Sequence, residues 1–491
     1  MAGIGIKLNK IYEKNTITSD LYGFAYSMFV TIGPMLTVMA AVLLTRYLLG
    51  FSLLGYAARK LYSCTVLYMF IFAFLVVAPF NPVLSRYLSD TLYEERYGDI
   101  LPCFYTGLFM TLLAGCCLGV PFSLHEHLVG EVPVYYVFTG FCGYICLIMV
   151  VYGMTFLSVT KDYYRLSQLF FVGMLLAVLL ALVFCYLLRM EGTYSSLLGL
   201  TLGFFIIAAL EYGQIRHFFE ENSGQYRPLL RYFKKYWQLM FINFLYVLGL
   251  YIHNFVFWTT DLGTVVAKSF ICAEPYDVAT CVAMFTNIMA TIIFISRVEM
   301  KFRFRYKAHT EAVIGGRWMD IRTTQRRMFR QISDELFNLV RIQFIVSVIL
   351  YLLVILLMPR MGYGGLVMEF YHCLAAGYFP LFIMYAAILF LFYFNDLSGA
   401  LMVSALFCAA VWIGSLVCVH LPYLWGGLGV FAGSLAGFIA AYFRLRWIER
   451  NYDTHVFCAG QLLKPAAGVK PSSKVFDRRN GIDDTKLVAQ K

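Results

Sequence analysis

One apolar run near the middle of the chain carries polar and aromatic residues on a single helical face. Asn243, Tyr246, His253 and Phe257 follow one another at positions that a helix places on one side. Polar groups are costly inside a lipid bilayer, so these residues are candidates for the wall of a transport pathway. Amides can bond to sugar hydroxyls, and aromatic rings can stack on sugar rings. The alternative is that the Asn and His side chains bond to neighbouring helices.

Charged residues near the ends of other apolar runs form a second set of pathway or vestibule candidates. These are Glu211, Asp261, Glu369, Asp396 and Arg46. Charge costs little at the membrane interface, so position alone also explains several of them. Gly33 and Pro34 should bend or loosen the first helix, because proline removes a backbone hydrogen bond. A gate and a purely structural bend both fit that pair.

The sequence contains no motif typical of catalysis or of cofactor binding. Walker A, HExxH, GxSxG and EF-hand patterns are all absent. His125 and His127 flank Glu126 in a predicted outer loop, where exposed polarity explains them better than a metal site. Most of the 13 cysteines, such as Cys64 and Cys408, lie in apolar runs without a CxxC pair, so we expect packing roles. We predict neither an enzyme nor a metal or cofactor site.

The elements that position these residues follow from composition. The chain is 61% hydrophobic and 14% charged, whereas soluble domains carry about 25% charged residues. A spanning helix needs roughly 20 apolar residues, and twelve such runs occur: 22–48, 61–80, 101–121, 133–158, 166–188, 194–214, 238–260, 277–297, 342–359, 368–394, 397–420 and 424–443. Gly429, Gly433 and Gly437 recur every four residues in the last run, which predicts close helix packing. We predict an all-α polytopic membrane protein of about twelve transmembrane helices, in two six-helix lobes around a central cavity.

Lys and Arg are unevenly divided between the two predicted sides of the membrane. With both termini in the cytoplasm, only six of the 39 lie outside, namely Arg46, Arg59, Lys60, Arg189, Lys268 and Arg360. The positive-inside rule therefore favours this orientation in a bacterial cytoplasmic (inner) membrane. The concentrated basic charge indicates attraction to anionic lipid rather than a nucleic-acid partner.

Charge and loop length divide the chain into five predicted segments. They are a cytoplasmic amphipathic N-terminus at 1–20, a first lobe at 21–214, a basic inter-lobe loop at 215–237, a second lobe at 238–446 and a tail at 447–491. The tail lacks periodicity, and we expect it to be disordered.

A basic amphipathic helix is predicted within the cytoplasmic loop 298–341. Trp318 begins it, and apolar residues at helical spacing alternate with Arg322, Arg326, Arg327 and Arg330. Such a helix would lie on anionic lipid, dock a cytoplasmic partner or only connect two halves of the protein.

The N-terminus carries a more specific pattern. It reads MAGIGIKLNKIYEKNTITSDLYGFAYSMFVTIGPML, with a MAGIG start, a short basic stretch at 6–14 and the Gly-Pro pair in the first helix. This start resembles the PelG family of Pel exopolysaccharide export proteins, which belongs to the multidrug/oligosaccharidyl-lipid/polysaccharide flippase superfamily. The chain length, the twelve runs and the basic loop after the eighth run also look like that family.

The resemblance implies a function and partners. It implies translocation of a growing Pel chain, rich in N-acetylgalactosamine, beside a cytoplasmic glycosyltransferase, a cyclic-di-GMP-sensing membrane protein and a further membrane scaffold. Drug-exporting relatives often couple to a cation through an acid in the first helix, but residues 21–46 contain no Asp or Glu. Two alternatives stay open. One is a flippase for lipid-linked oligosaccharide or a small-molecule exporter, and the other is a membrane scaffold that recruits a glycosyltransferase.

Overall fold

The computed structural model describes residues 17–158, 163–288, 291, 294 and 298–455. Fifteen α-helices and one two-stranded sheet are present in this part of the chain. The described residues up to Tyr442 form one compact unit, and a second unit begins at Phe443, inside the last helix. Most of the predicted amphipathic N-terminus and most of the predicted disordered tail lie outside the described residues.

The helices of the first half pack mainly with one another, and we call them the first helix group. They are α2 (Ile17–Leu48), α3 (Tyr56–Val77), α4 (Asn81–Tyr93), α5 (Ile100–Leu128), α6 (Val134–Leu157), α7 (Tyr163–Leu182) and α8 (Gly192–Phe218). Helix α8 packs against both α6 and α7, while α3 and α5 pack against α6. A short amphipathic helix, α9 (Arg227–Lys235), lies in the predicted inter-lobe loop.

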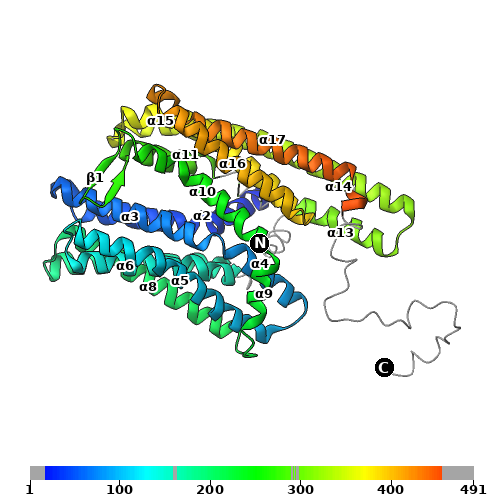
Figure 1. The fold of residues 1–491 in the computed structure, drawn as a ribbon, viewed down its shortest axis with the longest axis horizontal. Helices are drawn as coiled ribbons and strands as arrows, with labels where there is room; N and C mark the ends of the chain where they lie inside the picture. Colours follow the sequence, from blue (N-terminus) through cyan, green and yellow to red (C-terminus); the bar gives the residue numbers. More distant parts are fainter. Residues whose placement is uncertain (1–16, 159–162, 289–290, 292–293, 295–297, 456–491) are drawn as a thin grey trace. The chain divides into compact units, whose positions relative to one another are not determined.

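The second helix group follows α9. It comprises α10 (Trp237–Trp258), α11 (Glu274–Asn287), α13 (Glu299–Gly315), α14 (Trp318–Leu357), α15 (Leu366–Tyr393), α16 (Leu397–Cys418) and α17 (Leu428–Arg450). Helix α10 packs along α16, and α11 packs along α15. The two groups occupy different parts of the compact unit in Figure 1.

Ten helices in the described part of the chain are long and apolar enough to cross a membrane. Of the other two predicted runs, 22–48 lies within α2 and 277–297 begins inside α11, and both include residues that are not fully described. The chain is therefore a mainly helical, multi-pass membrane protein, as the composition predicted. The exact count of twelve spans and the central cavity stay predictions.

Helix α2 continues through its Gly-Pro pair. Pro34 lies inside the helix, and the preceding Gly33 carbonyl accepts a hydrogen bond from Thr37 Oγ1 at 2.7 Å. Proline cannot donate to the preceding turn, so this side-chain bond adds a local contact where the backbone ladder is weakened.

The glycine spacing of the last run brings α16 and α17 into backbone contact. A Cβ placed at Gly433 would lie 2.7 Å from the backbone nitrogen of Val411, and one at Gly429 would lie 2.5 Å from that of Ser415. Both distances are shorter than non-bonded atoms tolerate, so only glycine fits. The predicted packing role of this spacing is confirmed.

A β-hairpin projects between α10 and α11. Strand β1 (Thr264–Val266) pairs antiparallel with β2 (Phe270–Cys272), with Val266 opposite Phe270. Figure 1 places this hairpin at one end of the compact unit, beside α3, and the turn between α13 and α14 at the other end. We call these the hairpin end and the opposite end.

Helix α14 is longer than a membrane requires. Its 40 residues extend about 60 Å at 1.5 Å per residue, against roughly 30 Å for the bilayer interior. The predicted basic amphipathic helix is its first half, and the spanning run is its second half. Met328, Phe329 and Ile332 on the apolar face are buried. That face therefore packs within the protein, whereas Arg326, Arg327 and Arg330 are exposed.

Candidate functional site

The two helix groups meet along α10 and around the hairpin. Helix α10 contacts α3 and α4, and both strands contact α3. At the opposite end, Arg86 Nη1 of α4 donates to Asn395 Oδ1 after α15 at 3.0 Å. A transporter of alternating access must separate its halves at contacts of this kind. The junction is therefore the candidate functional site.

Tyr68 of α3 is the central aromatic residue at the hairpin end. Its ring stacks on Trp258 of α10, with centroids 5.1 Å apart, and also contacts Phe122 and Phe270. Its hydroxyl donates to the Ile271 carbonyl at 2.9 Å and accepts from the Ile271 N–H at 3.0 Å. One side chain thus ties the first group to both α10 and the hairpin.

Two ion pairs flank this aromatic cluster. Lys60 of α3 pairs with Glu274, the first residue of α11. Lys268 at the hairpin turn pairs with Glu131 after α5, with Nζ and Oε1 2.7 Å apart. The hydrogen bond from Lys268 holds the pKa of the exposed Glu131 carboxyl below its usual value. Exposed pairs contribute little stability, so the Lys268 pair mainly orients the hairpin.

An aromatic pocket of about 230 Å³ lies beside Tyr68, between α3, α5 and α6. Its rings come from Tyr68, Phe72, Phe122, Phe141, Tyr144 and Phe270. Glu126 also lines the pocket; the residue is 5% exposed, and its Oε1 has no hydrogen-bond partner among the described residues. A carboxylate beside aromatic rings can accept a hydrogen bond from a hydroxyl or ammonium group.

The pocket corrects one sequence-based expectation. His125, Glu126 and His127 were predicted to lie in an outer loop, but α5 continues to Leu128 and places them in its last turn. Glu126 is consequently buried rather than exposed. The run 101–121 ended too early because the polar triplet lowers hydropathy without breaking the helix.

A buried network holds the base of the hairpin. Asp277 of α11 accepts hydrogen bonds from Trp258 Nε1 at 2.9 Å, Asn254 Nδ2 at 2.8 Å and the Ala273 N–H at 3.1 Å. Trp258 precedes the hairpin and Ala273 follows it, so one carboxylate joins both of its ends. Sequence reasoning missed Asp277. The sequence signal for Asp277 was an acid two residues after Pro275, at the start of the apolar run 277–297.

His253 and Phe257 of the predicted polar face lie inside the second group. His253 is fully buried, with Nδ1 2.9 Å from the Tyr276 hydroxyl and Nε2 3.3 Å from the Tyr378 hydroxyl. Phe257 stacks on Tyr276 with ring centroids 4.0 Å apart. In this conformation both residues connect α10 to α11 or α15.

The other two residues of that face have different surroundings. Tyr246 is buried and stacks on Tyr385 of α15, with centroids 4.7 Å apart. Asn243 is half-buried, and its Nδ2 donates to the Ala78 carbonyl of the first group at 2.7 Å. Asn243 is thus the member of the four that lies at the junction itself.

Glu211 and Arg46 occupy the first helix group. Glu211 of α8 is 1% exposed and lies against Gly153 of α6, and neither carboxylate oxygen has a partner among the described residues. Such a buried acid is a functional candidate in a membrane protein. Arg46, in the last turn of α2, lies over the Phe51 ring at 5.7 Å.

The remaining predicted acids are spread over separate places. Asp396 is buried and caps α16, since its Oδ1 accepts from the Gly399 N–H at 3.1 Å. Asp261 follows α10 and Glu369 lies in the first turn of α15, and both are exposed. The structure does not bring these acids together.

The predicted contact residues for lipid or a partner lie on the first half of α14. Arg326, Arg327 and Arg330 are exposed. The Arg322 guanidinium lies over the ring of Trp318 at 4.5 Å, and Trp318 is 63% exposed. The arginines therefore form a basic face on the helical hairpin of α13 and α14.

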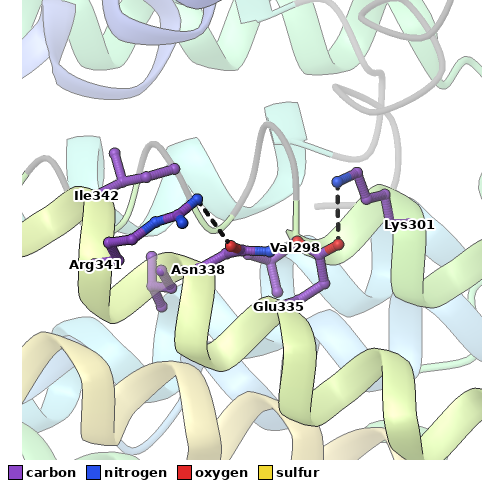
Figure 2. A pocket seen from close by; sticks show the side chains of 7 residues that line it. Val298, Lys301, Glu335, Asn338, Arg341 and Ile342 are labelled. Atoms are coloured by element: carbon purple, nitrogen blue, oxygen red, sulfur yellow. Dashed lines mark hydrogen bonds and ion pairs between the residues drawn. The ribbon is translucent and has the colours of Figure 1, made fainter.

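Figure 2 shows a second cavity, of about 230 Å³, between α13 and α14. Lys301 Nζ lies 3.1 Å from Glu335 Oε1, and Arg341 Nη2 donates to Asn338 Oδ1 at 3.3 Å. Its described lining contains no aromatic ring. Compared with the pocket at Tyr68, it offers charge but no stacking surface.

Several solved structures share the fold. An outward-facing multidrug resistance MATE family transporter of the MOP superfamily gives a TM-score of 0.58 at 12% identity, over 87% of this chain and 96% of that chain. The inward-facing conformation of such a transporter gives 0.57 at 12% identity, over 86% and 96%. The bent form of the Vibrio cholerae MATE transporter VcmN gives 0.56 at 13% identity, over 93% and 100%. At these identities the likeness shows the fold alone.

Comparison with known sequences gives the family. None of the curated proteins compared with the chain matches it. The model of the PelG family, described as "Putative exopolysaccharide Exporter (EPS-E)", matches residues 1–457. The resemblance first noted at the N-terminus is therefore confirmed over most of the chain. With its helical membrane fold, this chain belongs to the PelG family and is a transporter rather than an enzyme.

Proposed function

We propose that this chain moves a growing Pel-type exopolysaccharide, rich in N-acetylgalactosamine, across the bacterial cytoplasmic membrane. It would do so within a synthesis-secretion complex. The family match over residues 1–457 carries the proposal. The fold supports it, because structures with this fold occur in outward-facing and inward-facing forms. The proposed orientation has both termini in the cytoplasm and the hairpin end outside.

The aromatic pocket is the proposed sugar subsite near the exit. Its rings offer flat apolar faces for the C–H faces of a sugar, and Glu126 can accept from a hydroxyl or an amino group. Asn243 at the junction and Glu211 in the first group are proposed further points of the pathway. Tyr246, His253 and Phe257 would take part only if the second group rearranges, because they are buried in this conformation.

The basic face of α14 is the proposed contact with the cytoplasmic side of the complex. Its partners would be anionic lipid, the glycosyltransferase, the cyclic-di-GMP-sensing membrane protein or the further scaffold. The first helix lacks an acid between residues 21 and 46. A polymer driven forward by its own synthesis would not require cation coupling through that helix.

The proposal is tested by deleting the chain while its partner genes stay intact. We expect secreted galactosamine-containing polymer to disappear, while glycosyltransferase activity in extracts of the same cells is retained. The two measurements separate export from synthesis. Normal secretion of the polymer would contradict the proposed translocation. Loss of both the secreted polymer and the glycosyltransferase activity would favour a scaffold.

A second experiment separates transport from recruitment within one protein. Glu126→Gln replaces one acceptor oxygen of the pocket carboxyl with an amide donor, and a combined Arg326→Ala, Arg327→Ala, Arg330→Ala variant removes the basic face. For a translocase, we expect Glu126→Gln to reduce export at unchanged protein level and unchanged co-purification of the glycosyltransferase. The arginine variant should instead reduce co-purification. Wild-type export by Glu126→Gln would remove the pocket from the proposed pathway.

The likeness to multidrug transporters favours one second candidate, an exporter of a lipid-linked oligosaccharide or small molecule. Binding of a lipid-linked sugar donor to the purified protein would support it. If the purified protein does not bind the donor and deletion of the chain abolishes polymer secretion, the growing polymer is favoured as the substrate.

A further inference from the structure

Two cysteines from different helix groups touch at the hairpin end. Cys64 lies in α3 of the first group, and Cys272 is the last residue of β2 before the second group continues into α11. Their Sγ atoms are 2.9 Å apart, although 208 residues separate them in the chain. A disulfide needs about 2.05 Å between the sulfurs, so a displacement of less than about 1 Å would close the bond.

The surroundings hold the two sulfurs in this position. Tyr68, one helical turn after Cys64, bonds through its hydroxyl to both backbone groups of Ile271, the neighbour of Cys272. Lys60, one turn before Cys64, pairs with Glu274, two residues after Cys272. The approach of the cysteines is therefore fixed by contacts on both sides along α3.

Both side chains are buried together. Cys64 is 1% exposed and Cys272 is 3% exposed, in a cluster with Phe270. The Cys64 thiol donates to the Cys272 sulfur, and this hydrogen bond lowers the pKa of the docked Cys272 thiol. The sequence predicted packing roles for cysteines such as Cys64, but packing alone does not require two sulfurs in direct contact.

We propose that Cys64 and Cys272 form a disulfide that covalently ties the first helix group to the second at the hairpin end. The two groups then cannot separate at this point. Any opening of the junction must pivot about it. The proposal goes beyond export and shares with the proposed function only the placement of the hairpin end outside, where disulfides persist.

Formation of the bond requires an oxidant, which we take to be a disulfide-bearing protein oxidant outside the cytoplasm. The Cys272 thiolate attacks a sulfur of that disulfide and releases one thiolate of the oxidant. The deprotonated Cys64 then attacks the Cys272 sulfur of the mixed disulfide, forming the Cys64–Cys272 bond and releasing the second thiolate. The two thiols lose two protons and two electrons, and the oxidant becomes a dithiol. Because the pair is buried once docked, this exchange takes place before the hairpin docks on α3.

The test uses the connection between the groups. Residues 220–226 are exposed, and no atom lies within 4 Å of a Cβ placed at Gly224. A protease site inserted there in the full-length membrane protein allows the chain to be cut between the groups. After thiols are blocked in intact cells, we expect the two fragments to run together on a denaturing gel without reductant and to separate with it.

Matched variants decide the assignment. In Cys64→Ala and in Cys272→Ala, the fragments should separate without reductant, whereas Cys408→Ala should behave as wild type. A melting curve of each variant confirms that it is folded. Wild-type fragments that separate without reductant would overturn the proposal. Fragments that stay linked in either single variant would do the same, because another bond would then be responsible. The assay does not depend on export, so its failure is distinguishable from failure of the proposed function.

Discussion

Asp277→Ala is expected to detach the base of the hairpin and to abolish export. The substitution leaves the Trp258 indole N–H, the Asn254 amide and the Ala273 N–H without their common acceptor. Leaving a buried donor without its partner costs about 1–3 kcal/mol, and here three donors lose their acceptor at once. We expect the free energy of unfolding to fall by about 3 kcal/mol or more, measured by denaturation of the purified protein in detergent.

Two further variants make the Asp277 result specific. Asp277→Asn keeps the shape and one acceptor oxygen, so its loss should be smaller. Asp261→Ala removes an exposed carboxylate just before the hairpin and should leave the protein level and stability unchanged. A stability of Asp277→Ala equal to that of wild type would mean that the hairpin does not depend on this network.

Gly433→Leu is expected to prevent assembly of α16 with α17. Even a Cβ at this position would lie 2.7 Å from the backbone nitrogen of Val411, and a backbone cannot move away as a flexible side chain can. Overpacking of a tight contact typically costs 1–3 kcal/mol and sometimes more, and we expect about 3 kcal/mol or more here. The measurements are the amount of protein in the membrane and its thermal unfolding.

The matched control for Gly433 is Gly213→Leu. Gly213 is exposed on α8, and no atom lies within 4 Å of a Cβ placed there. The same chemical change should therefore leave the protein level close to wild type. Equal behaviour of the two variants would show that the α16–α17 contact is looser than the structure indicates.

Junction contacts explain why two polar residues of the same predicted face have different roles. Asn243 bonds across to the first group, whereas His253 bonds to tyrosines of its own group. Helical spacing places both on one side of α10 but does not identify what packs there. Whether that face serves transport therefore depends on movement of the two helix groups. Polymer export by an Asn243→Ala variant at normal protein level measures the contribution of the Asn243 contact.

The sequence by itself determined the apolar spanning helices of this protein. Hydrophobic runs of spanning length located the spanning helices, the four-residue glycine spacing predicted close packing of the last helix, and the N-terminal pattern indicated the family. These features depend on local composition and on neighbours a few residues apart, because a bilayer selects apolar segments one at a time.

Only the tertiary structure decided which distant residues meet. Cys64 and Cys272 stand 208 residues apart, and neither has a local signal that indicates the other. Burial of Glu126 in the aromatic pocket depends on α3 and α6, and the role of Asp277 depends on the hairpin fold between α10 and α11. Such contacts are set by how helices pack and by the register of the hairpin. Neither helix packing nor hairpin register can be read from hydropathy or residue spacing, so only the tertiary structure identified the junction.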